Sequence, residues 1–271
     1  MPLLQRAGAQ IYYSVTDLTH PWDEEPQTII FHPGLGTTCD TWSDWLPLLA
    51  DRFRLVTYDM RGCGRSTLTE PSPVWSYDLL MDDLLAVADA VGAQRFHFIG
   101  ESLGGIIGYN LGIFRPQRIH SIVSVTASHQ GGWLRGGVAD WQSVIDKGGM
   151  KAWSDVMMPG RFHLDRLSPD KLAWYQATQE CSVAHVVLDV SGLIRSMDLR
   201  PDLHRISTPI LLLVGEASPF VPVEAVVDIR QAIGEAASLH VVSGARHGVV
   251  FSHPKECVAA FERFLCERVV S

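Results

Sequence analysis

The sequence predicts an α/β fold in which helices flank a mostly parallel central sheet. Three observations support this prediction. Short apolar runs alternate with helical stretches early in the chain, and a glycine-flanked serine turn over 100–104 joins an apolar run to a helix. The strand rhythm then stops over 128–205 and resumes afterwards. We therefore expect a core formed by residues 1–127 and 206–271, with 128–205 as a helical cap.

The first half of the chain shows strand and helix patterns in turn. Residues 9–15 alternate as a half-buried strand does, and 28–31 and 54–58 are short apolar runs typical of buried strands. Residues 77–91 fit an amphipathic helix with one apolar face. Its acidic side chains are expected to form a solvated face in the early turns: Asp78, Asp82 and Asp83.

The pattern continues on both sides of the predicted cap. Strands are expected over 96–99, 118–125, 209–215 and 238–242, and helices over 103–114, 223–233 and 254–268. Within the cap, Ser168 followed by Pro169 marks a helix start, because serine caps a helix N-terminus and proline suits its first position. The cap is rich in tryptophan and methionine, of which most are expected to pack against the core.

Composition narrows the function further. A net charge of −8 and the absence of a basic run argue against nucleic-acid binding, and no apolar run is long enough to span a membrane. The five cysteines are scattered, with no paired spacing that would suggest a zinc site or a disulfide framework. We expect a cytoplasmic protein that acts on a small molecule without a cofactor or metal, and the sequence leaves its oligomeric state open.

Residues 100–104, Gly-Glu-Ser-Leu-Gly, have the composition of a nucleophile elbow. A serine held in a sharp strand-to-helix turn has strained backbone angles, and its crowded neighbours favour glycine two positions before and after it. The following helix directs its N-terminal amides toward the same point. Ser102 is therefore the candidate nucleophile, and the amide of Leu103 is a candidate oxyanion-hole donor.

Two other loops supply the remaining candidates. The loop over 32–38 is glycine-flanked and follows a predicted strand, so the amide of Leu35 can complete the oxyanion hole. A serine nucleophile also needs a base. His247 lies in a short loop after the last predicted strand, which places it at the same sheet edge as the elbow, and it is our candidate base.

These motifs together resemble the α/β-hydrolase superfamily over nearly the whole chain. The resemblance rests on residues 32–36, 59–66, 100–104 and His247, and it implies an α/β-hydrolase fold with the cap inserted after the sixth strand. Within the superfamily the chain looks most similar to the 3-oxoadipate enol-lactonase group. The shared features are residues 35–38 (Leu-Gly-Thr-Thr), 147–150 (Lys-Gly-Gly-Met) and 197–200 (Met-Asp-Leu-Arg).

One departure from the family pattern concerns the third member of the catalytic triad. The family places an aspartate in the turn after the strand that ends at Gly215, and here Ser218 stands at that position. Loss of this acid costs known serine enzymes about 10⁴-fold in rate. Either Glu216 reaches His247 from two positions earlier, or Ser218 orients the imidazole directly or through water, or the protein is not a conventional hydrolase.

The leading hypothesis is a serine hydrolase that cleaves a small ester or lactone through an acyl-enzyme. One alternative is cofactor-free cleavage of a ring or C–C bond, with His247 as base and Ser102 only positioning the substrate. Another is a ligand-binding or sensor protein that retains a hydrolase pocket. A cap arginine could also pair with a substrate carboxylate, and the candidates are Arg135, Arg161 and Arg166.

Overall fold

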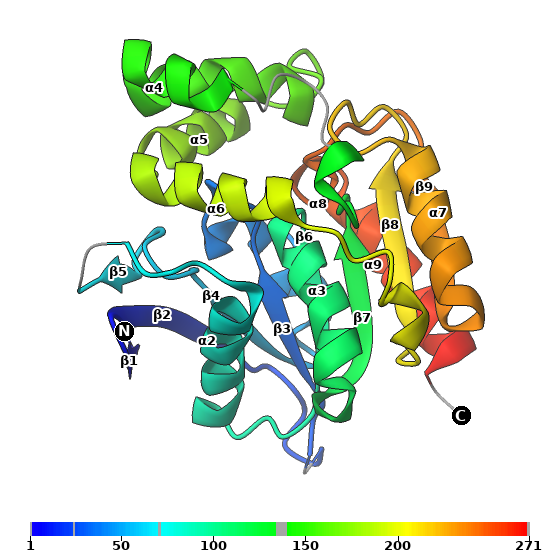
Figure 1. The fold of residues 1–271 in the computed structure, drawn as a ribbon. Helices are drawn as coiled ribbons and strands as arrows, with labels where there is room; N and C mark the ends of the chain where they lie inside the picture. Colours follow the sequence, from blue (N-terminus) through cyan, green and yellow to red (C-terminus); the bar gives the residue numbers. More distant parts are fainter. Residues whose placement is uncertain (1, 24, 70–71, 134–139, 270–271) are drawn as a thin grey trace.

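A mostly parallel β-sheet runs through the centre of the molecule in the computed structural model, which describes residues 2–23, 25–69, 72–133 and 140–269 (Figure 1). The described strands follow the order β1-β2-β4-β3-β6-β7-β8-β9, and β5 pairs with β2. The pairs that involve β2 are antiparallel, whereas the pairs from β4 to β9 are parallel. The strands are β1 Leu3–Arg6, β2 Ala9–Thr16, β3 Thr28–His32, β4 Arg54–Tyr58, β5 Thr67–Leu68, β6 Phe96–Glu101, β7 Ile119–Val125, β8 Ile210–Gly215 and β9 Ala237–Val242.

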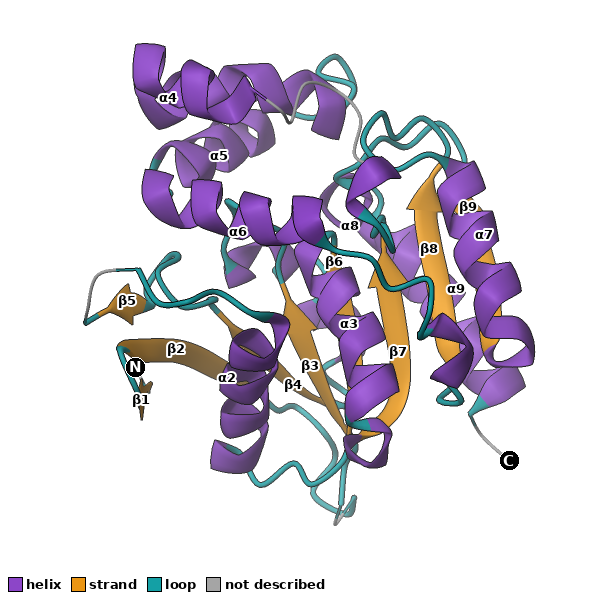
Figure 2. Cartoon of the chain, in the orientation of Figure 1, coloured by secondary structure: helices purple, strands orange, loops and turns teal. Residues whose placement is uncertain are grey.

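Helices cover both faces of the sheet, and a group of three lies across its carboxyl edge (Figure 2). Helices α2, α3 and α7 lie on one face, and α9 lies on the other. Helices α4, α5 and α6 come between β7 and β8 in the chain and form the cap. The helices are α1 Leu46–Leu49, α2 Tyr77–Ala90, α3 Leu103–Phe114, α4 Trp141–Arg161, α5 Pro169–Glu180, α6 Ala184–Ser196, α7 Val223–Ile233, α8 Val249–Ser252 and α9 Pro254–Arg268.

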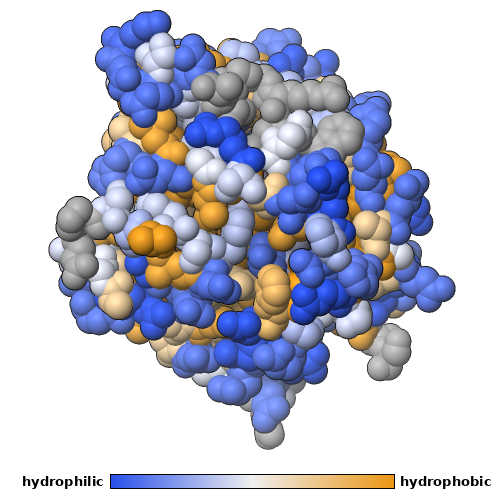
Figure 3. All heavy atoms as spheres, viewed as in Figure 1, coloured by the Kyte–Doolittle hydropathy of each residue, from blue (hydrophilic) through white to orange (hydrophobic). Residues whose placement is uncertain are grey.

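Two hydrophobic clusters lie on opposite faces of the sheet, because alternate residues of each strand point to opposite sides. In β6, Phe98 packs into the cluster that holds α2, α3 and α7, whereas Ile99 packs into the cluster that holds α1 and α9. Both side chains are fully buried. The outer surface is mainly hydrophilic on the face that Figure 3 shows, with apolar residues scattered among the polar ones.

The predicted fold class is confirmed, and the predicted elements agree closely with the structure. The helices predicted over 223–233 and 254–268 have those bounds, and α5 begins at Pro169 with the Ser168 side chain accepting a hydrogen bond from the amide of Lys171. The short strands β1 and β5 were missed. Each has at most four residues and none is fully buried, so neither produces a clear apolar pattern.

The expectation that the acidic residues of α2 face solvent is wrong for Asp83. This side chain is 2% exposed and binds the equally buried Arg61 through two hydrogen bonds of 2.6 and 2.8 Å. Arg6 donates a third hydrogen bond to the same carboxylate at 3.1 Å. A buried guanidinium requires a counter-ion, and the turn after β4 places Arg61 beneath α2, where Asp83 supplies it.

Helix α3 lies close against the sheet because glycines recur along one side of it. A Cβ atom at Gly108 would come 3.0 Å from Ile122 of β7, and one at Gly112 would meet the same residue at the same distance. Larger side chains at these two positions would push the helix away from the strand. This close contact fixes the N-terminus of α3 at the carboxyl end of β6, where the elbow lies.

Helix α2 offers a test of local stability away from the site. The Ser76 hydroxyl caps this helix by accepting a hydrogen bond from the amide of Leu79 at 3.1 Å. We expect Ser76→Ala to lower the free energy of unfolding by about 1 kcal/mol, because an N-terminal amide loses its partner. Urea denaturation measures this change. Ser76→Asp is the control and should retain most of the stability; an equal loss in both variants would contradict a capping role.

Candidate active site

Ser102 occupies a strained turn between β6 and α3. Its backbone angles are φ 54° and ψ −108°, a region that residues with a side chain rarely adopt. A Cβ atom at Gly100 would lie 2.3 Å from the backbone of Gly104, and one at Gly104 would lie 2.6 Å from the carbonyl oxygen of His32. Both positions therefore require glycine, as the sequence pattern indicated, and the turn holds the serine in place.

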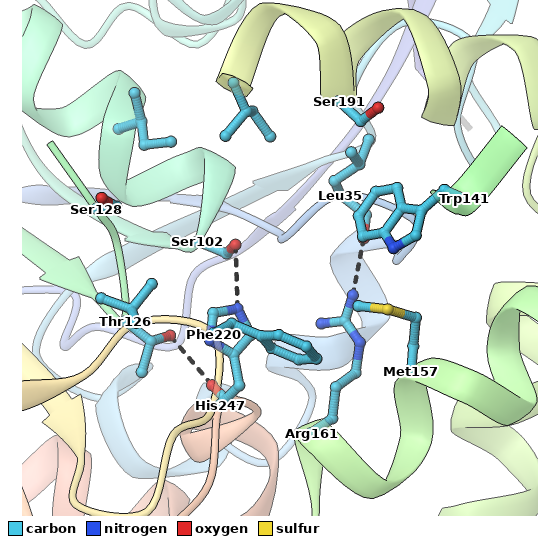
Figure 4. Close-up of a pocket in the computed structure, with 13 residues that line it drawn as sticks. Leu35, Ser102, Thr126, Ser128, Trp141, Met157, Arg161, Ser191, Phe220 and His247 are labelled. Atoms are coloured by element: carbon cyan, nitrogen blue, oxygen red, sulfur yellow. Dashed lines mark hydrogen bonds between the residues drawn. The ribbon is translucent and has the colours of Figure 1, made fainter. Parts of the chain in front are cut away.

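His247 lies in the loop after β9, and its imidazole faces Ser102 across the pocket (Figure 4). Its Nε2 atom is 3.2 Å from the Ser102 Oγ atom, which is hydrogen-bond distance. The two residues are 145 positions apart in the chain. The structure thus brings together the predicted nucleophile and the predicted base.

Two neighbours that the sequence analysis did not select hold His247 in place. The Thr126 hydroxyl donates a hydrogen bond of 3.1 Å to the backbone carbonyl of His247. The Phe220 ring packs edge-on against the imidazole, with ring centres 5.0 Å apart. Thr126 follows β7 and has a positive φ of 44°, and threonine gives no sequence signal for that conformation.

The second imidazole nitrogen of His247 faces Ser218. The Nδ1 atom is 3.3 Å from the Ser218 Oγ atom, and the amide of Val221 donates to the same oxygen at 3.3 Å. A neutral imidazole protonated on Nδ1 would donate to Ser218 and leave Nε2 free to accept the Ser102 proton. Ser218 therefore occupies the place that a triad acid takes in serine enzymes, with a neutral oxygen instead of a carboxylate.

Glu216 is directed away from His247, contrary to the expectation that it might reach the imidazole. Its exposed carboxylate accepts hydrogen bonds from the Ser243 hydroxyl at 2.9 Å and from the Gly244 amide at 2.8 Å. These two donors hold the pKa of the Glu216 carboxyl below its usual value. The turn after β8 thus directs the Glu216 side chain toward the exposed start of the loop after β9, at Ser243 and Gly244. The arrangement does not support Glu216 as the partner of His247.

The surroundings of His247 make its imidazole a weak base. Burial and, to a smaller extent, the positive charge of Arg161 together lower the pKa of His247 to about 3. A carboxylate partner would act in the opposite sense by favouring the charged imidazolium. The absence of a carboxylate at Ser218 is therefore consistent with a base that stays neutral in moderately acidic solution.

The two candidate oxyanion-hole residues come from the start of α3 and from the loop after β3. Leu103 is the first residue of α3, where the backbone amide has no acceptor within the helix. The loop that carries Leu35 is a tight turn closed by Thr37, whose amide and hydroxyl both bond to the carbonyl of Gly34. The carbonyl of Leu35 accepts a hydrogen bond of 3.2 Å from Arg161 of the cap.

A small pocket of about 40 Å³ opens beside Ser102 and His247, between the core and the cap. Because one water needs at least about 10–15 Å³ of such space, this volume favours a compact ligand. The cap provides part of the lining, so some of its aromatic and methionine residues line the pocket besides packing the interface. The lining residues are Leu35, Ser102, Ile106, Thr126, Ser128, Trp141, Met157, Arg161, Ser191, Ile194, Phe220, Val221 and His247.

The three cap arginines are placed differently. Arg161 is 3% exposed and lines the pocket, as Figure 4 shows. Arg166 is exposed and does not line this pocket. Arg135 lies outside the described residues. The sequence analysis named all three as candidates, because residue type does not show which cap arginine lines the pocket. That depends on the path of the cap.

The fold and the elbow define an α/β hydrolase, and comparison with known proteins agrees. The model of the alpha/beta hydrolase family matches residues 29–260, and the chain belongs to this family. Among the described residues, no helix is both long and apolar enough to cross a bilayer.

Individual relatives have related names. A protein from Rhizobium rhizogenes that carries the name carbamate hydrolase RutD is 27% identical over 95% of this chain and 98% of its own length. A 3-oxoadipate enol-lactonase from Acinetobacter baylyi is 29% identical over 72% of this chain and 73% of its own. The crystal structure of a hydrolase from Pseudomonas aeruginosa superposes with a TM-score of 0.85 at 28% identity, covering 97% of each chain.

Proposed function

We propose that this protein is a serine hydrolase that cleaves a small ester or lactone through an acyl-enzyme. The observation that carries the proposal is the 3.2 Å contact between the Ser102 Oγ atom and the His247 Nε2 atom beside a small pocket. The names of the relatives support hydrolysis as the reaction class. The small volume of the pocket supports a compact acyl group.

In the proposed mechanism, the Ser102 oxygen attacks the substrate carbonyl while His247 Nε2 accepts the hydroxyl proton. The backbone amides of Leu35 and Leu103 stabilise the negative oxygen of the tetrahedral intermediate. As the intermediate collapses, the C–O bond to the leaving group breaks and His247 returns the proton to that oxygen. A water molecule, deprotonated by His247, then attacks the acyl-enzyme and releases the acid.

Because the partner of His247 is the neutral hydroxyl of Ser218, some classes of substrate fit the site better than others. Without a carboxylate at position 218, the imidazolium formed during attack is poorly stabilised. A substrate with a good leaving group has a lower barrier and tolerates a weaker base. Activated esters and enol lactones meet this requirement better than amides do, so we place them first among candidate substrates.

The test is covalent trapping of the nucleophile. A fluorophosphonate probe is expected to add one phosphonyl group to Ser102, detected as a mass shift on the peptide that contains it. Ser102→Ala should give no adduct, and His247→Ala should react much more slowly. Ser128 lines the same pocket, but its hydroxyl donates to the carbonyl of Gln130 and has no hydrogen bond to a histidine among the described residues. Ser128→Ala is therefore the matched control and should label normally. A protein that stays unlabelled, as a ligand-binding or sensor protein would, contradicts the proposal.

A further inference from the structure

The last turn of the cap helix α4 is bound to the loop that carries His247. A helix ends in carbonyl groups that have no amide partner within the helix. Three consecutive carbonyls at the end of α4 accept hydrogen bonds from three consecutive residues of this loop. The pairs are Pro159 with the Arg246 guanidinium, Gly160 with the His247 amide at 3.4 Å, and Arg161 with the Gly248 amide at 3.0 Å.

The backbone of His247 is therefore held by two separate parts of the chain. The cap accepts from its amide through the Gly160 carbonyl, whereas the core donates to its carbonyl through the Thr126 hydroxyl. The neighbouring amide of Gly248 also has its acceptor in the cap. The position of this loop thus depends on the end of α4 as well as on the sheet.

Gly160 also acts on the imidazole of His247, through the ring of Phe220. A Cβ atom at Gly160 would lie 2.3 Å from the Phe220 Cζ atom, much closer than carbon atoms approach in van der Waals contact. The same ring packs edge-on against the imidazole, beside which it lies in Figure 4. Because Phe220 is only 5% exposed, a methyl group at position 160 would push its ring against the imidazole or into the pocket.

A second glycine at this junction accommodates an aromatic ring from the cap. A Cβ atom at Gly248 would lie 2.3 Å from the Phe162 Cε1 atom. Gly248 has a φ of −81°, so the nearby ring, and not the backbone conformation, requires glycine there. Phe162 is itself held by Tyr175 of α5, with ring centres 4.7 Å apart. A core ring thus packs on a cap glycine, and a cap ring packs on a glycine of the base loop.

We propose, on the basis of the hydrolase function inferred above, that Gly160 and Phe220 are positioning residues that hold the His247 imidazole against Ser102. The elbow fixes Ser102 within the core, between β6 and α3. The base takes part of its support from the cap, so the catalytic pair is complete only when α4 is seated on the base loop. Misplacing a catalytic group by about 1 Å can lower the rate about 100-fold.

The experiment adds one methyl group to the junction with Gly160→Ala. Alanine favours a helix more than glycine does, so α4 itself gains from the change and a loss of activity reports the contact with Phe220. We expect kcat for p-nitrophenyl acetate to fall about 10- to 100-fold, with little change in KM. Gly192→Ala is the matched control. Gly192 lies in the cap helix α6, where a Cβ atom would meet nothing within 4 Å, and kcat should be unchanged.

Phe220→Leu provides the rescue, because leucine lacks the ring atoms that the new methyl group would meet. Phe220→Leu alone should lower kcat less than Gly160→Ala does, since it removes packing without adding a clash. In the double variant, kcat should return to the value of Phe220→Leu alone, whereas independent effects would multiply. A loss confined to KM, or multiplied losses in the double variant, would overturn the proposal.

Proton NMR follows the imidazole without any turnover. The ring signals of His247, assigned by their loss in His247→Ala, should shift in Gly160→Ala and stay in place in Gly192→Ala. Phe220→Leu should also shift them, which keeps the test available if Gly160→Ala does not fold. If p-nitrophenyl acetate is not cleaved, the hydrolase proposal fails, and these signals still report the contact. Signals of His247 that are the same in all these variants refute the inference.

Discussion

Replacing Ser102 by alanine is expected to lower kcat for p-nitrophenyl acetate by about 10⁴-fold or more, to a residual rate set by binding and the oxyanion hole. The physical reason is that no other hydroxyl in the described part of the pocket has a hydrogen bond to His247 Nε2. His247→Ala should cause a loss of similar size, because without a base the serine stays protonated. The double variant should be scarcely worse than either single one, since the two groups act as a unit.

The same pair of variants separates the proposed mechanism from cofactor-free ring or C–C cleavage. If His247 acts directly on the substrate and Ser102 only positions it, Ser102→Ala would retain substantial turnover while His247→Ala would not. Steady-state kinetics on both purified variants, with far-ultraviolet circular dichroism to verify folding, distinguishes the two cases. A serine variant that keeps more than about a tenth of the activity would rule out the acyl-enzyme.

Ser218→Asp is expected to increase kcat for esters with poor leaving groups by about 10²- to 10⁴-fold. The Ser218 Oγ atom already lies 3.3 Å from His247 Nδ1, and the amide of Val221 points to the same oxygen. An aspartate at this position can accept both hydrogen bonds and places a negative charge beside the imidazole. That charge stabilises the imidazolium of the transition state, which the serine hydroxyl does much less well.

The pH profile gives an independent readout of Ser218→Asp. The reaction needs a neutral imidazole, and burial with Arg161 lowers the pKa of His247 to about 3. In the natural sequence, kcat/KM should therefore stay nearly constant down to about pH 5, whereas an ordinary histidine base would already be protonated there. In Ser218→Asp, the new carboxylate favours the protonated form and should move the acid limb upward.

The controls for this prediction are neutral substitutions at the same position. Ser218→Asn matches the size of aspartate without its charge and should leave the acid limb where it is in the natural sequence. Ser218→Ala removes the hydrogen bond and should reduce kcat by about 10-fold. If aspartate and asparagine gave the same rates and the same pH profiles, position 218 would have no electrostatic influence on His247.

The local features of the site were predictable from the sequence because each is a requirement of the backbone itself. Gly100 and Gly104 must lack a side chain for the chain to turn sharply around Ser102, so their spacing marks the elbow without any knowledge of the fold. The alternation of apolar runs and helical patterns predicted the fold class, because periodicity is also a local property of the sequence. The position of His247 followed from its place after the last strand.

The sequence did not predict which side chains from distant parts of the chain contact one another. Glu216 and Ser218 were equal candidates until the turn after β8 directed one outward and the other toward His247. Asp83 was indistinguishable from its exposed neighbours until the loop after β4 placed Arg61 beneath it. Residue type and spacing do not encode such contacts one by one.

The cap shows the same division. The sequence predicted that the cap is helical. Only the path of the cap over the sheet edge places Arg161, and not Arg166, in the same pocket as Ser102. The sequence by itself determined the fold class and the elbow, because glycine spacing and apolar periodicity are local properties of the backbone. The tertiary structure alone decided the partner of His247 and the charge of the pocket, because these result from packing between segments that are distant in the chain.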